Sequence, residues 1–175
     1  MEFAHEGEVP GVTAVQEFTG VFRAEHRQVR DLLLELVRAF GDRDAGRART
    51  LIAAVAEATG PHIRYEEEAM CPQLTGIFGD AYVGKLLANH DGAIRNAREL
   101  LWLAGHDELT DEQARRGAEL TRQILPHVSD CDGLTMMVET LPDDTAGRIL
   151  SARKAALDAG LDLLTWAATA RDRRA

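Results

Sequence analysis

The sequence predicts an all-α fold, an up-down-up-down four-helix bundle with an additional C-terminal helix. Apolar side chains make up 45% of the 175 residues and aromatic residues only 5%, and the abundance of Ala, Leu, Arg and Glu favours helix over strand. Apolar residues recur at steps of three and four along long segments, which is the period of a helix with one buried face. Four of these segments each carry a histidine on the apolar side.

Two helices are expected in the first half of the chain. The first begins near Thr13 and ends at about Gly41, with His26 in its apolar stripe. The second spans about residues 44 to 71 and contains His62. Pro72 is expected to end this helix, and the Gly60-Pro61 pair is expected to kink it. Residues 1 to 12 carry no period and are predicted to be a mobile lead-in.

Three helices are expected in the second half. The third spans about residues 80 to 105 and carries His90. Thr110 followed by Gln113 is typical of a capping box and opens the fourth, which carries His127. A last helix, from about 143 to 171, has no titratable residue in its stripe and is interpreted as a brace. We therefore expect a metal-binding bundle over residues 13 to 141 and a bracing helix within 142 to 175.

The four histidines follow an internal repeat. His26 and His90 lie 64 residues apart, and the Pro-His pairs at 61–62 and 126–127 lie 65 apart. Helices joined by short loops pack antiparallel, so the histidines should meet at roughly mid-height of the bundle. The repeat predicts one shared buried site.

A metal explains this arrangement better than a conventional core does. Buried imidazoles and carboxylates without a cation would be costly unpaired groups, whereas divalent metals bind both types of ligand. Glu66 lies one helical turn after His62 and can offer one oxygen to each of two metals. We interpret Glu67 and Glu68 as solvated or as supporting the ligands from outside.

The motifs Phe22 to His26, His62 to Met70, His90, and His127 to Asp132 resemble the hemerythrin and hemerythrin-like (HHE cation-binding) family over residues 18 to 138. The resemblance implies a pair of non-haem iron ions, for which an oxo or hydroxo bridge is an option. It also implies that Glu66 and Asp132 bridge the ions. The implied ligands are His26, His62, Glu66, His90, His127 and Asp132.

The chain departs from this family pattern at one position, and at another the pattern does not fit an ideal helix. Oxygen-carrying hemerythrins have a further histidine four residues before the third-helix ligand, where this chain has Leu86. Asp132 lies five residues after His127, about 140° around an ideal helix, so it needs a local bulge. Asp130 and Cys131 are the alternatives, with Asp132 preferred. Tyr65 and Tyr82 stay open as supplementary ligands or redox groups, and Glu67 stays open as a supplementary ligand.

The histidine missing at Leu86 should leave one metal with an open coordination position. We expect this position to react with dioxygen or peroxide, as in an oxidase, an oxygenase or a peroxide-removing enzyme. A small organic substrate is also possible. The alternative is a protein that binds or senses oxygen, nitric oxide or iron without turnover. The ferritin-like class is disfavoured, because the only Glu-x-x-His pair, Glu2 and His5, lies outside any helical pattern.

The composition limits the classes of binding partner and the cellular compartment that we expect for this protein. The formal net charge of -9 argues against nucleic acid and anionic membranes as partners, since both require a basic face. No apolar run approaches the roughly 18 residues of a membrane span, and no signal peptide is recognisable. Two cysteines are too few for a disulfide framework, so we expect a cytoplasmic protein whose oligomeric state is open.

Overall fold

The computed structural model describes residues 11–171, apart from the side chains of residues 130–132. The predicted lead-in therefore lies, up to residue 10, outside the described residues, as does the Glu2–His5 pair. Every described element is helical. In chain order they are α1 (Ala14–Gly41), α2 (Ala45–Tyr65), the π-helical turn η1 (Glu66–Met70), α3 (Cys71–Phe78), α4 (Asp80–Ala104), α5 (Asp111–Val138), α6 (Asp143–Ala159) and α7 (Leu163–Thr169).

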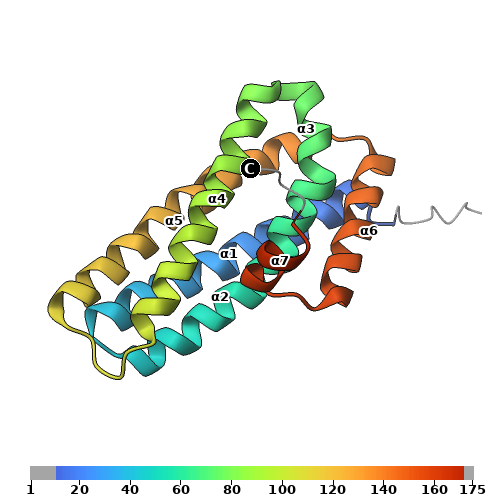
Figure 1. The fold of residues 1–175 in the computed structure, drawn as a ribbon. Helices are drawn as coiled ribbons and strands as arrows, with labels where there is room; N and C mark the ends of the chain where they lie inside the picture. The colour runs from blue at the N-terminus through green and yellow to red at the C-terminus, as the bar shows by residue number, and fades with distance from the viewer. Residues whose placement is uncertain (1–10, 172–175) are drawn as a thin grey trace, which may run out of the picture.

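Four long helices form the bundle that the sequence predicts. Around the bundle α1 packs against α2 and α5, and α4 packs against the other side of α2 and α5. Figure 1 shows these helices side by side along the long axis, with the α1–α2 and α4–α5 connections at one end. The predicted all-α bundle with an additional C-terminal helix is confirmed. Within residues 11–171, no helix combines the length and apolarity needed to cross a bilayer.

The helix starts follow from local capping. Thr13 accepts a hydrogen bond from the backbone N–H of Gln16, whose side chain bonds back to the Thr13 N–H. Thr110 and Gln113 form the same reciprocal pair at the start of α5, as the sequence indicated. Each pair satisfies two backbone donors that a helix N-terminus otherwise leaves unbonded. These caps fix where α1 and α5 begin, and so the height at which their histidines lie.

The second ligand-bearing helix differs from the prediction at its end. Pro72 does not end it, because the chain passes through the π-helical turn Glu66–Met70 and continues as α3, with Pro72 in the first turn. Proline is tolerated there because the first-turn N–H groups have no partner within a helix. The spacing of Asp132 predicts a local bulge on the fourth bundle helix, but α5 is α-helical over Asp111–Val138, and the π-helical turn lies at the end of the second helix.

The C-terminal segment is two helices rather than one helix reaching Arg171. Gly160 adopts a left-handed conformation, with φ of 62°, and ends α6 before α7 begins. The chain then runs close to α2, where a β-carbon on Gly60 would lie 2.3 Å from the carbonyl oxygen of Leu161. Only glycine permits this approach. In Figure 1, α6 and α7 cover one side of the bundle away from the α1–α2 connection.

Two apolar regions flank the histidines. On one side, Phe18, Phe22, Tyr65 and Leu86 belong to a cluster of buried residues that extends to α3 and α6. On the other side, Val29, Leu33, Val55 and Val128 are buried together along α1, α2 and α5. The histidines are therefore enclosed by hydrocarbon, where uncompensated polar atoms are costly.

Candidate metal centre

The four predicted histidines come together in two pairs. The rings of His26 on α1 and His62 on α2 have centroids 4.5 Å apart and stand nearly perpendicular. The rings of His90 on α4 and His127 on α5 repeat this arrangement at 4.8 Å. The two pairs correspond to the two halves of the internal repeat in the sequence.

Glu66 lies between the two pairs and presents one oxygen to each. Its Oε1 is 3.2 Å from Nε2 of His62 and 3.9 Å from Nε2 of His26. Its Oε2 is 3.1 Å from Nε2 of His90. Two groups of potential metal ligands result, both including Glu66: one with His26 and His62, the other with His90 and His127.

These residues fit a divalent cation. Both carboxylate oxygens of Glu66 and the Nε2 of His90 are buried without a hydrogen-bond partner among the described residues, since their close approach lacks hydrogen-bond geometry. Buried polar atoms are nearly always bonded, so such a cluster requires an explanation. Imidazole nitrogen and carboxylate oxygen together suit iron, manganese or zinc better than calcium or magnesium, which prefer oxygen alone.

The protonation of the site follows from burial and charge. Burial alone would lower the pKa of His62, but the carboxylates of Glu66 and Glu25 raise it to about 10. Burial alone would raise the pKa of Glu66, but His62 and His90 hold it well below its ordinary value. Burial, together with the charge of His90, lowers the pKa of His127 to about 4. A cation therefore meets an ionised Glu66 and a neutral His127, and must displace a proton from His62.

The ring nitrogens that face away from the centre are held by oxygen acceptors. Nδ1 of His26 lies 2.8 Å from the carbonyl oxygen of Phe22. Nδ1 of His62 lies 2.8 Å from Oε2 of Glu25. Because these oxygens only accept, each Nδ1 must carry the proton and donate it. This leaves Nε2 toward the centre as the atom for a metal, the arrangement that orients metal-binding histidines in proteins.

Glu67 accepts the hydrogen bond from the outward-facing ring nitrogen of the third histidine, His90. Its Oε1 lies 3.0 Å from Nδ1 of His90, and its side chain is only 7% exposed. Of the two predicted roles for Glu67, support from outside the ligands matches this geometry and solvation does not. Glu68, by contrast, is exposed and pairs with Arg64.

Sequence reasoning missed Glu25 as a partner of His62. The two residues are 37 positions apart, and Glu25 adjoins His26 rather than the histidine that it holds. The sequence carries no periodic signal for this contact. It depends on the rotation of α1 against α2, which only packing sets.

The two tyrosines left open are placed differently. Tyr65 is buried, and its hydroxyl donates to Oε2 of Glu25 at 2.8 Å and lies 3.1 Å from Nδ1 of His62. It thus faces the side of His62 away from the centre. Tyr82 is 38% exposed and packs on Phe78, outside the histidine cluster.

Asp132, the predicted second bridge, and its alternatives Asp130 and Cys131 lie on α5 among the residues whose side chains the structure does not describe. The choice between them stays a prediction. Leu86, one turn before His90, is buried in the apolar cluster with Phe22 and Tyr65.

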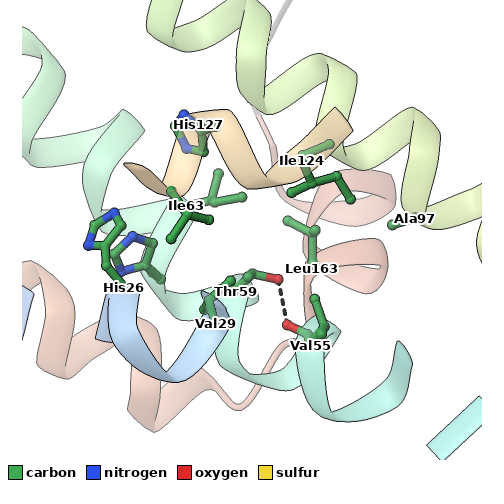
Figure 2. Close-up of a pocket in the computed structure, with 12 residues that line it drawn as sticks. His26, Val29, Val55, Thr59, Ile63, Ala97, Ile124, His127 and Leu163 are labelled. Atoms are coloured by element: carbon green, nitrogen blue, oxygen red, sulfur yellow. Dashed lines mark hydrogen bonds between the residues drawn. The ribbon is translucent and has the colours of Figure 1, made fainter. Parts of the chain in front are cut away.

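An apolar cavity of about 40 Å³ adjoins the histidines. Figure 2 shows the rings of His26 and His127 at one side of it, with Ala97 and Leu163 at the other. The hydroxyl of Thr59 is used within α2, where it donates to the carbonyl oxygen of Val55 at 2.7 Å. Apart from the imidazoles, the lining therefore offers a ligand little besides hydrocarbon.

A cavity of this size limits what can reach the centre from this side. A single water needs about 10–15 Å³, and apolar cavities remain dry while accepting small apolar guests. The space fits a molecule of two or three heavy atoms.

The comparisons with known proteins agree with this geometry. The family model described as the hemerythrin HHE cation-binding domain matches residues 18–136, which contain all four histidines and Glu66. Searches of curated proteins and of solved structures gave no match. With the match covering more than half of its length, the chain belongs to the hemerythrin HHE cation-binding family.

Proposed function

We propose that this chain holds two iron ions at the histidine cluster and reacts there with dioxygen or peroxide. The observation that carries the proposal is the position of Glu66, with Oε1 toward His62 and Oε2 toward His90. One carboxylate with an oxygen facing each of two ligand groups is the arrangement that a bridged metal pair requires. The ligands of the proposal are His26, His62, Glu66, His90, His127 and Asp132.

Two irons would supply the electrons that reduce an oxygen species, chemistry that no side chain of the site provides alone. The chain's own contribution is positioning and enclosure. Phe22, Glu25 and Glu67 orient three of the rings, and the surrounding apolar residues keep bulk water away. Leu86 offers no ligand atom, so the ligand set leaves a coordination position for an incoming molecule.

The cavity beside the histidines supports a small, neutral co-reactant. Its volume of about 40 Å³ suits dioxygen or hydrogen peroxide and is too small for a sizeable organic molecule. An organic substrate would have to donate electrons from outside this cavity.

A second function, binding or sensing oxygen or nitric oxide without turnover, is favoured by one observation. Thr59 carries the one hydroxyl among the described residues lining the cavity, and this hydroxyl donates to the carbonyl oxygen of Val55. Among the described residues that line the cavity, the histidines are the groups that could transfer a proton to a bound species. A carrier or sensor needs no such group, whereas an enzyme must draw its protons through the histidines.

One experiment tests the proposal and separates the two functions. The purified protein is loaded with iron anaerobically, its iron content is measured, and optical spectra are recorded by stopped flow after mixing with oxygen or peroxide. The proposal expects two irons per chain and repeated consumption of peroxide or oxygen with a reductant present. A single spectral change that reverses under vacuum would favour binding alone. One zinc per chain, or no iron, would refute the proposal.

A further inference from the structure

Arg153 connects the C-terminal helices to the first half of the metal centre. Its Nε donates to Oε1 of Glu25 at 2.7 Å. The other oxygen of that carboxylate accepts the hydrogen bond from Nδ1 of His62 at 2.8 Å. The guanidinium on α6 therefore holds the carboxylate that holds a candidate ligand on α2.

Arg171, which follows α7, makes the equivalent connection to the second half. Its Nε and Nη2 donate to the two oxygens of Glu67 at 2.9 and 2.6 Å. Glu67 in turn accepts from Nδ1 of His90 at 3.0 Å. A third nitrogen of Arg171 reaches Asp91 at 2.9 Å, and the arginine side chain is only 10% exposed. A two-point contact of this kind fixes the carboxylate in orientation as well as in position.

The contacts made by Arg153 and those made by Arg171 follow the same arrangement. In each, a histidine donates to a carboxylate, and the carboxylate is fixed from outside by an arginine of the C-terminal segment. Both arginines lie beyond residues 18–136, the part matched by the family model. The segment also packs tightly where it passes Gly60, close to His62.

From this geometry we infer that residues 143–171 form part of the metal centre, and that Arg153 and Arg171 are positioning residues for His62 and His90. The inference rests on the proposed metal site, but it does not depend on which reaction occurs there. The segment then serves to retain the metal, since a metal leaves fastest when a ligand ring is free to turn away.

Two simpler roles predict different results. If the arginines only attach α6 and α7 to the bundle, their removal should lower the melting temperature and leave metal binding unchanged. If they act only as nearby positive charges, their removal should strengthen the binding of a cation, because like charges repel. If the arginines position the histidines, their removal should weaken the retention of the metal. The direction of the change in metal binding therefore distinguishes the three roles.

The test uses the full chain loaded with Co²⁺, whose visible spectrum reports its ligands, and measures metal release to an excess of chelator by stopped flow. The variants are Arg153→Gln and Arg171→Gln. Arg148→Gln is the matched control, because Arg148 lies on α6 but pairs with the exposed Asp144. Melting of the metal-free proteins is followed by circular dichroism.

Release should be about tenfold faster in each variant, as for other residues that support metal ligands from outside. The control should stay within twofold of the parent. Combining Arg171→Gln with Glu67→Gln should add less than a further twofold, because the arginine acts through that carboxylate. Should Arg171→Gln not fold, Arg171→Lys retains the charge without the two-point contact and should still speed release.

Metal release that is unchanged or slower in both Arg153→Gln and Arg171→Gln would overturn the inference. It would also be overturned if Arg171→Gln sped release equally in the parent protein and in the Glu67→Gln variant. A parent protein that takes up no metal would instead refute the metal centre itself. The failure of the inference and the failure of the proposed function are therefore distinguishable.

Discussion

His90 approaches Glu66 with its Nε2 only 3.1 Å from the Oε2 oxygen, yet neither atom has a hydrogen-bond partner among the residues that the structure describes. Glu66 opens the π-helical turn, and His90 lies in the middle of α4. Their side chains are almost completely buried. A cation between the two atoms and their neighbours would satisfy both, whereas hydrocarbon cannot.

The first prediction concerns Glu66 as a bridge. Glu66→Gln should reduce iron from the proposed two ions per chain to fewer than one, because glutamine keeps one oxygen and no charge and so cannot bridge two ions. His62→Ala should lower iron content to a similar degree. Elemental analysis of protein refilled with iron measures this directly.

Glu68→Gln is the control for Glu66→Gln. Glu68 is two residues away in the same turn, but it is exposed and pairs with Arg64. Its replacement should leave the iron content unchanged. Iron content equal to that of the parent in Glu66→Gln would contradict the bridge.

The second prediction is that Tyr65 supports the centre without binding metal. Its hydroxyl faces Glu25 and the Nδ1 side of His62, away from Nε2. Tyr65→Phe should therefore keep full metal content and lose about 1–2 kcal/mol of stability through the missing hydrogen bond. Chemical denaturation and metal analysis check the two parts. Loss of half or more of the iron would contradict this prediction.

The third prediction concerns the fourth ligand helix. Asp132→Ala should lower metal occupancy more than Asp130→Ala or Cys131→Ser, as the five-residue spacing from His127 in the family pattern implies. Iron content and the visible spectrum of each variant measure the effect. If Asp130→Ala is the most damaging change, the ideal-helix angle decides the ligand and the Asp132 assignment is wrong.

Much of the fold was predictable because local signals agreed with the global pattern. The capping pair at Thr110 marks the start of α5 within one residue, and the apolar stripes identify the faces that carry His26 and His90. Helical periodicity combined with the internal repeat also predicted that the histidines would meet. That inference needs only antiparallel packing and the 1.5 Å rise per residue.

Other features depended on packing that no single segment encodes. The π-helical turn at Glu66–Met70 follows from how α2 continues into α3, and Pro72 looked like a stop although it fits a helix start. The helix break at Gly160 is explained by packing, because residues 161–163, which follow it, lie directly against Gly60. The contact between Glu25 and Arg153 joins residues 128 apart in sequence, and neither has a motif to reveal it.

The fourth prediction tests the cavity as the place where a small reactant lies. Ala97 lines it from α4, so Ala97→Leu should fill much of the space, cost about 1–3 kcal/mol by overpacking, and slow the reaction with oxygen or peroxide. Iron content should equal that of the parent protein, since Ala97 offers no ligand atom.

Val29→Ala is the counterpart to Ala97→Leu, because it enlarges the cavity from the α1 side. It should cost stability as cavity-forming changes do and leave the reaction at least as fast. Stopped-flow rates for both variants decide the matter. Equal slowing by the filling and the enlarging change would show that disturbed packing, not access, is responsible.

The last prediction is that Leu86 keeps a coordination position open. Leu86 lies one helical turn before His90 and is buried in the adjoining apolar cluster, so a histidine there would share the face that carries His90. In the metal-free protein, Leu86→His should cost about 1–3 kcal/mol for burying an unpaired imidazole. In the iron-loaded protein most of this cost should vanish, because the metal would bind the new ring.

With that position filled, an incoming molecule has fewer places to bind, so peroxide consumption by Leu86→His should fall by at least about tenfold, or about 1.4 kcal/mol in the barrier. Leu86→Met serves as the control because it preserves side-chain volume, and its reaction should stay close to that of the parent. Steady-state peroxide consumption, measured with the melting temperature of each variant with and without iron, checks both effects. A Leu86→His protein that gains stability from iron and still consumes peroxide at the parental rate would show that the reaction does not use this position.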